Sequence, residues 1–199
     1  MDQYQRIAGH FQQAIELIAI SVDALAEPIE LSSELISQAL QKENKVIVCG
    51  NGPDRALSQL FSGNLINRFE NDRPGLPALN LDSSSANLST IDDASNINDI
   101  FARQITALGQ AGDVLFCISS ERSHQNLAHA IAAAYDRQMA VVVLSNESNE
   151  QLREMLRHED VELSVTAHRQ PRVVELQTMV IQCICELIER SLFGDYDQE

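Results

Sequence analysis

The segment from residue 45 to residue 69 most constrains the fold of this chain. It begins with the short apolar run VIVC, passes through a tight GNGP turn, and continues into a stretch whose apolar residues recur at helical spacing. A strand, a glycine turn and a helix in this order form the opening unit of an open parallel α/β sheet. Free N–H groups at the start of such a helix face the sheet edge where these folds commonly bind ligands. The sequence therefore places a candidate ligand site at this first turn.

The alternation of strands and helices continues along the chain. Further strands are predicted at residues 76–81, 113–118, 139–144 and 161–165, and further helices at 97–108, 127–135, 149–157 and 173–193. A short helix is expected to begin at the serines of residues 83–85. Continuous apolar strands such as DVLFCI and MAVVVL are typical of a parallel sheet that is covered on both faces. The fold class is therefore α/β, with a parallel sheet flanked by helices.

Two helices are expected before the first strand, at residues 3–26 and 29–42. Pro28 separates them, because proline disfavours helix at the residue before it. The chain is predicted to form a single domain in residues 1–199. In this prediction residues 1–43 are an N-terminal helical pair, and residues 44–199 are the α/β core with the C-terminal helix. The long N-terminal helix is expected to pack on a partner subunit or, alternatively, on its own sheet.

Charge and composition exclude several functions. The formal net charge is −15, with 14 Lys and Arg against 29 Asp and Glu and no long basic run, so direct nucleic-acid binding is not expected. No apolar run approaches the roughly 20 residues of a membrane helix, and the N-terminus lacks the order of a signal peptide. The cysteines lie inside apolar runs without metal-ligand or CxxC spacing, which predicts reduced thiols in a cytoplasmic protein: Cys49, Cys117, Cys183 and Cys185.

Four segments carry a resemblance to a known family: CGNG at 49–52, NRFENDRPGLPAL at 67–79, NDIFARQITALGQAGDVLFCIS at 98–119 and HRQPRVVE at 168–175. The chain resembles the SIS (sugar isomerase) fold and its phosphoheptose isomerase-like branch. Within that branch it is most similar to the DiaA-type initiator-associating proteins, which bind the replication initiator DnaA. The resemblance implies a flavodoxin-like five-stranded sheet and a homotetramer with the long N-terminal and C-terminal helices at subunit interfaces.

The positions that the resemblance assigns to metal and catalysis differ in this chain. In the metal-dependent isomerases a His and a Glu lie one helical turn apart after the first turn, and a Gln and a His lie on the last helix. The corresponding residues here are Leu60, Asn64, Val174 and Gln182. Leucine cannot ligate a metal, and an amide is a poor base. The resemblance therefore implies no metal, no cofactor and no catalytic residue, so that an enzymatic function is uncertain and not favoured.

The two turns that hold phosphate in the family are retained in part. Pro53 offers no N–H, and Asp54 would repel a phosphate, although Asp54 also suits the first turn of a helix. In the second turn Glu121 adds another negative charge, which Arg122 or His124 could balance. The candidate residues of this degenerate phosphosugar pocket are Asn51, Gly52, Asp54, Arg68, Ser119, Ser120, Glu121 and His124. Arg68 could instead form a surface ion pair.

Two functions remain as expectations. The first is a non-catalytic binding protein that associates with DnaA and promotes its assembly at the replication origin. Leu192 and Phe193 are its candidate partner contacts, unless they pack against a neighbouring helix. The alternative is a phosphosugar-binding protein or a phosphoheptose isomerase-like enzyme with an altered active site.

Overall fold

The computed structural model describes residues 2–81, 97–121 and 124–194 of the chain. The expected helix start at residues 83–85 and Arg122 lie outside the described residues. No helix in the described ranges is long and apolar enough to span a membrane.

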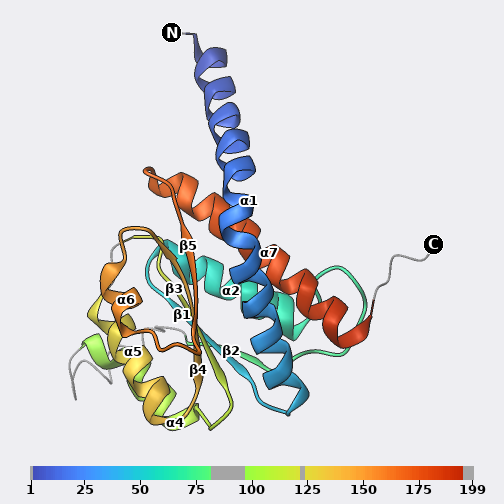
Figure 1. The fold of residues 1–199 in the computed structure, drawn as a ribbon, viewed down its shortest axis with the longest axis vertical. Coiled ribbons are helices and arrows are strands. Elements are labelled where there is room, and N and C mark those ends of the chain that lie inside the picture. The colour runs from blue at the N-terminus through green and yellow to red at the C-terminus, as the bar shows by residue number, and fades with distance from the viewer. Residues whose placement is uncertain (1, 82–96, 122–123, 195–199) are drawn as a thin grey trace.

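The first helix, α1 (Gln3–Gln41), is one continuous helix of 39 residues with Pro28 inside it. The prediction of two helices separated at Pro28 is therefore wrong, because the helix continues through the proline. An interior proline removes one backbone hydrogen bond and costs about 3 kcal/mol. Leu25 before the proline, and Ile36 and Leu40 after it, are all buried against the rest of the molecule, and this packing offsets the cost. The first turns of α1 extend beyond the body of the molecule (Figure 1).

Five parallel strands form the sheet in the order β2-β1-β3-β4-β5. They are β1 (Val46–Gly50), β2 (Ala78–Asn80), β3 (Val114–Ile118), β4 (Ala140–Asn146) and β5 (Val161–Val165). The register places Gly50 of β1 opposite Ile118 of β3, and Ile118 opposite Leu144 of β4. The direction of winding reverses between β1 and β3, which leaves a crevice at the carboxyl ends of these strands. The expected five-stranded parallel sheet with flavodoxin-like order is confirmed.

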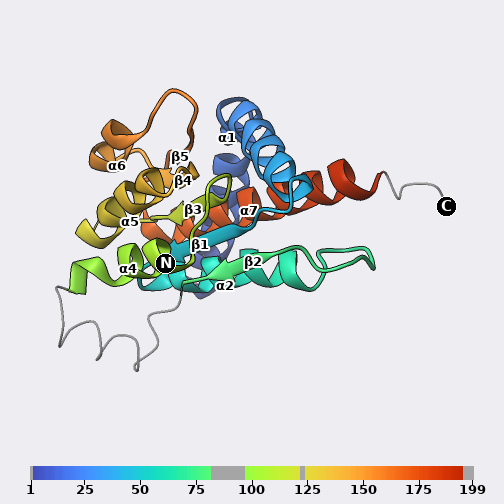
Figure 2. The same ribbon diagram turned by 90° about the horizontal axis from the view of Figure 1, so that it is seen from below.

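The helices form two layers, one on each face of the sheet (Figure 2). The bounds of the remaining helices are α2 (Pro53–Ile66), η1 (Ile97–Asp99), α4 (Ile100–Leu108), α5 (Gln125–Asp136), α6 (Glu150–Met155) and α7 (Gln170–Phe193). Helices α1, α2 and α7 pack on one face, around Val48 and Phe116. Helices α4, α5 and α6 pack on the other face, around Ile47 and Cys117. All four cysteines are free thiols, and only Cys183 is not fully buried.

The loop between α2 and β2 is fastened to α7 by a buried ion pair. The Arg73 guanidinium Nε lies 2.6 Å from Glu189 Oε1, and both side chains are at most 3% exposed. The same carboxylate accepts a hydrogen bond from the Phe69 N–H at 2.8 Å. The guanidinium also donates to the carbonyl groups of Asn64 and Leu65 at the end of α2. Every charge in this cluster has partners, and these contacts join the loop to both α2 and α7.

Candidate functional site

The first turn of the site is shaped by two glycines and a proline. A Cβ on Gly50 would lie 2.8 Å from the Asp54 carbonyl oxygen, so the end of β1 approaches α2 more closely than a side chain allows. Gly52 has a φ of +52°, a value that suits glycine, and precedes Pro53 at the first helical position. This turn brings Asp54 beneath the end of β3.

Asp54 is a buried carboxyl group that joins the two turns. Only 4% of the residue is exposed. Its Oδ2 accepts the Ser120 backbone N–H at 2.9 Å, while its Oδ1 has no hydrogen-bond partner among the described residues. Burial raises the pKa of Asp54, and the adjoining Ser120 hydroxyl and N–H oppose that increase. Asp54 is a first-turn acid of α2, as expected, but its carboxyl group reaches across the crevice.

A pair of amides also spans the crevice. Asn51 follows β1, and Asn126 lies in the first turn of α5. Each side-chain amide donates a hydrogen bond of 2.9 Å to the other. The amino ends of α2 and α5 are therefore held side by side, with their positive dipole ends near the same opening.

The second turn, residues 119–121, places two serines at the carboxyl end of β3. Ser119 and Ser120 are each 1% exposed. Glu121 and His124 are exposed beyond them, where the charge of Glu121 raises the pKa of Asp54 and that of His124 lowers it. A hollow of about 300 Å³ adjoins Ser120 and Glu121 and extends to His168 before α7. Most of the predicted pocket residues therefore meet at one edge of the sheet.

Arg68 is not brought to this edge. It lies beyond the far end of α2, a helix of 14 residues that spans about 20 Å, and its guanidinium is 3.9 Å from the exposed Asp72. Within one chain it forms the surface ion pair that the sequence offered as its alternative role. Leu192 packs against the core, and Phe193 lies under the Arg73 guanidinium, with 5.8 Å between the guanidinium carbon and the ring centroid.

The four positions assigned to metal and catalysis do not fit a metal ion. Leu60 and Gln182 are exposed, and Val174 is half-buried. Asn64 directs its amide to Cys185 Sγ at 3.8 Å. In the described ranges no three His, Cys, Asp or Glu side chains gather as a ligand set.

Sequence reasoning missed four amide residues of this site: Asn126, Asn146, Asn149 and Gln177. Asn146 ends β4 and Asn149 follows it by three residues, and polar residues at the carboxyl end of a parallel strand lie at the ligand edge of the sheet. Gln177 lies between Val173 and Val180 on the buried stripe of α7, and a polar residue there is the signal that could have revealed it.

The comparisons with known proteins agree with one another. A family model described as SIS domain matches residues 9–146. The phosphoheptose isomerase of Alkalilimnicola ehrlichii is 41% identical over 194 residues, which cover 98% of this chain and 99% of that protein. The phosphoheptose isomerase of Chromohalobacter salexigens is 39% identical, with 98% of each chain covered. The structure of phosphoheptose isomerase GmhA from Neisseria gonorrhoeae matches with a TM-score of 0.87 at 30% identity, covering 94% of this chain and 99% of that one.

These relatives correct the first of the two expected functions. Proteins that are 35–41% identical over 98% of this chain are named phosphoheptose isomerases. The expectation of a non-catalytic protein that associates with DnaA is therefore wrong. The alternative expectation, a phosphosugar-binding or isomerase function, has the better support.

Proposed function

The chain belongs to the SIS domain family and, within it, resembles the phosphoheptose isomerases over nearly its whole length; on this premise we propose that it binds a sugar phosphate at the crevice between β1 and β3 and interconverts its aldose and ketose forms. The observation that carries the proposal is the meeting of two helix amino ends and two buried serines at this crevice. Helix amino ends and serine hydroxyls are among the groups that bind phosphate in proteins.

The phosphate would lie beside the second turn. Ser119 and Ser120 supply hydroxyl groups, and the amino end of α5 supplies the favourable end of a 12-residue helix. Asp54 opposes an anion here by its charge, and this opposition is smallest when the carboxyl group is protonated. Burial raises the pKa of Asp54, so its opposition to an anion weakens as pH falls toward that pKa.

The isomerisation itself needs a group that moves a proton between two neighbouring carbon atoms. Since the residues at the four metal-associated positions do not fit a metal, this work falls to side chains at the turns. Glu121 and His124 are both exposed at the opening, near the amino end of α5. A carboxylate and an imidazole together can remove a proton at one carbon and return it at the next.

A direct assay tests the proposal. Purified protein would be incubated with a heptose phosphate in deuterated water, and proton NMR would follow conversion between the ketose and aldose forms with deuterium incorporation. We expect turnover in the native protein and its loss in Glu121→Gln. A native protein that shows neither turnover nor a thermal shift with millimolar heptose, hexose or inorganic phosphate would refute the proposal. Binding without turnover would limit the function to phosphosugar binding.

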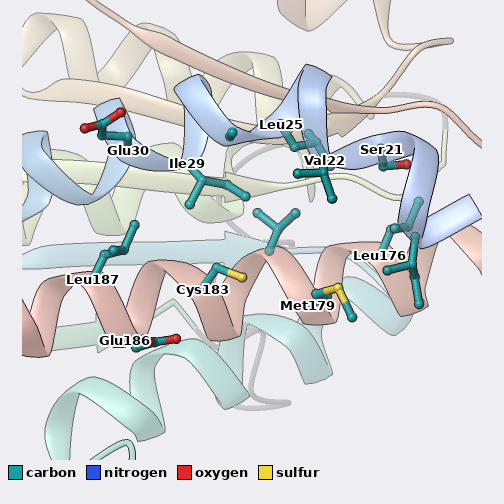
Figure 3. A pocket seen from close by; sticks show the side chains of 13 residues that line it. Ser21, Val22, Leu25, Ile29, Glu30, Leu176, Met179, Cys183, Glu186 and Leu187 are labelled. Carbon is teal, nitrogen blue, oxygen red and sulfur yellow. The ribbon is translucent and has the colours of Figure 1, made fainter. Parts of the chain in front are cut away.

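We also propose that the chain self-associates as a homotetramer through α1 and α7. An apolar groove of about 470 Å³ lies between these helices, with Leu25 and Ile29 on one side and Met179 and Cys183 on the other (Figure 3). Ahead of the groove, α1 exposes Ile7, Phe11 and Ile15 at four-residue spacing, each by more than half. An apolar stripe continuous with an apolar groove supports helix packing between copies of the chain.

A further inference from the structure

Three side-chain amides bind three consecutive backbone carbonyl groups of the second turn. Asn149 Nδ2 donates to the carbonyl oxygen atoms of Ser119 at 3.2 Å and of Glu121 at 2.5 Å. Asn146 Nδ2 donates to the Ser120 carbonyl oxygen at 2.6 Å. Gln177 Nε2 approaches the Ser119 carbonyl oxygen at 3.4 Å. Every carbonyl group of the turn is therefore held by an amide.

The three amides come from three different elements. Asn146 ends β4, Asn149 precedes α6, and Gln177 lies in the middle of α7. They are 7%, 1% and 0% exposed, respectively. The turn is consequently fixed to β4, to the start of α6 and to α7 at once, and its backbone cannot rotate without breaking contacts to all three.

Two of these amides are costly for the fold. Asn149 Oδ1 and Gln177 Oε1 are buried and have no hydrogen-bond partner among the described residues. A buried polar atom without a partner destabilises a fold, so an apolar side chain of similar size would suit the position of Gln177 better as packing. The Gln177 amide donates only long hydrogen bonds, at 3.3–3.4 Å, to the Ser119 carbonyl group of the turn and to the Leu144 and Ser145 carbonyl groups of β4, so it holds the turn and β4 together more than it adds strong bonds.

The orientation has a direct effect on the crevice. With its carbonyl groups directed toward β4, α6 and α7, the turn presents the Ser120 N–H on the opposite side, where it reaches Asp54 Oδ2 at 2.9 Å. A peptide group that rotated would replace this N–H donor with a carbonyl acceptor, which repels phosphate. The amides therefore keep the carbonyl acceptors of the turn away from the side on which Asp54 and the crevice lie.

We propose that Asn146, Asn149 and Gln177 are positioning residues, which hold the 119–121 turn with its carbonyl oxygen atoms directed away from a phosphate bound at the crevice. This inference rests on the proposed binding of a sugar phosphate. The three residues need not touch the sugar phosphate themselves.

The test compares ligand affinity with stability in the full-length protein. Gln177→Met removes the amide donor at similar volume and also removes the unpartnered Oε1. We expect the thermal stability of the unliganded protein to be unchanged or higher, and the affinity for a heptose phosphate and for inorganic phosphate to fall at least tenfold. Hydrogen exchange in the peptide that contains residues 115–121 should become faster. Asn149→Leu is the second variant, with the same expectation for affinity and hydrogen exchange.

Tyr135→Phe is the matched control. Tyr135 lies at the end of α5 that is far from the crevice, and the substitution removes its hydrogen bonds to the Met155 carbonyl and to the Asp160 carboxylate. This variant should bind a heptose phosphate and inorganic phosphate with affinities within twofold of those of the native protein. If the native protein binds and Gln177→Met and Asn149→Leu bind equally well with unchanged hydrogen exchange, the positioning role is wrong and the proposed function stands. If both variants lose stability in proportion to affinity, the amides are merely structural and the inference is overturned. If the native protein binds no phosphate compound, the proposed function fails and the inference fails with it.

Discussion

At the scale of single residues, the carboxyl group of Asp54 links stability to pH. Burial raises its pKa, so the folded protein holds this proton more tightly than the unfolded chain does. The fold is therefore favoured by Asp54 at low pH, and this contribution is lost as pH rises from the ordinary value of 3.8 through the raised value. Above that range the ionised carboxylate is a cost to the fold.

Replacing Asp54 with asparagine should remove this cost while keeping an acceptor for the Ser120 N–H. We expect Asp54→Asn to raise stability at pH 7 by about 1 kcal/mol, or roughly 2–4 °C in Tm for a chain of this size. Differential scanning calorimetry at pH 4 and at pH 7 checks the sign, because the gain should shrink at the lower pH. A gain that is the same at both pH values would contradict the assignment of the raised pKa to Asp54.

Two glycines, one at the end of β1 and one in the last turn of α2, should respond to alanine in opposite ways. At Gly50 the added Cβ meets the Asp54 carbonyl oxygen at 2.8 Å, so backbone must shift and the fold should lose about 1–3 kcal/mol. At Gly63, within α2, the added Cβ meets nothing within 4 Å, and the variant should gain about 1 kcal/mol from helix propensity. Urea unfolding of both variants tests this. Equal effects at the two positions would show that the close approach at Gly50 is unimportant.

At the scale of elements, the 67–77 loop depends on one carboxylate of α7. Burial alone would raise the pKa of Glu189, but the Phe69 N–H, the Arg73 guanidinium and the N–H groups of Asn71 and Glu70 outweigh it, so the pKa is lowered. A lowered pKa contributes stability above the ordinary value of 4.5, and this stability is lost as pH falls through the folded-state value. Acid should therefore release this loop from α7.

Glu189→Gln should destabilise the protein by about 3–5 kcal/mol at neutral pH, since it leaves the buried Arg73 without a counter-charge. Asp72→Asn, in the same loop, is the matched control because the Arg68–Asp72 pair is exposed. It should change stability by less than about 1 kcal/mol. Chemical denaturation at pH 7 distinguishes the two, and a Glu189→Gln variant as stable as the control would show that the buried pair is not needed.

The elements themselves could be predicted from the sequence to different degrees. β5 has the predicted bounds, and the strand at residues 114–118 differs by one residue, because continuous apolar runs bounded by polar turns leave few choices. Pro28 misled the prediction, because burial on both sides of a proline cannot be read from local preference. The serines of the second turn were predicted from the resemblance to the phosphate-holding turn of the family, at the end of the strand at residues 113–118. Their amide supports were not, because Gln177 meets the turn only through tertiary packing.

At the scale of the whole molecule, the N-terminal turns of α1 hold an apolar face that the chain does not cover. Ile7, Phe11 and Ile15 are 57%, 68% and 61% exposed, whereas residues from Ser21 onward begin to be buried against the body. An isolated helix gains nothing from such a face in water. The proposed self-association gives these residues a surface to pack on.

A single charge on this face should therefore weaken the self-association of the chain. We expect Phe11→Glu to lower the molar mass in solution toward that of the 22.1 kDa chain. Gln13→Glu, an exposed position of the same helix, adds the same charge and should leave the mass unchanged. Multi-angle light scattering at several concentrations measures both. A native protein that is monomeric at all concentrations would refute the self-association.

The contact between α1 and α7 also affects how the chain reaches its folded state during synthesis. The Arg172 guanidinium donates to the His10 carbonyl oxygen at 3.0 Å across 162 residues of sequence. A ribosome therefore releases α1 long before the helix that covers its buried stripe has been made. Contacts between such distant segments slow folding and leave apolar surface open in the meantime. The apolar stripe of α1 therefore stays uncovered until the sheet and α7 have been made. During this time molecular chaperones could bind to the stripe.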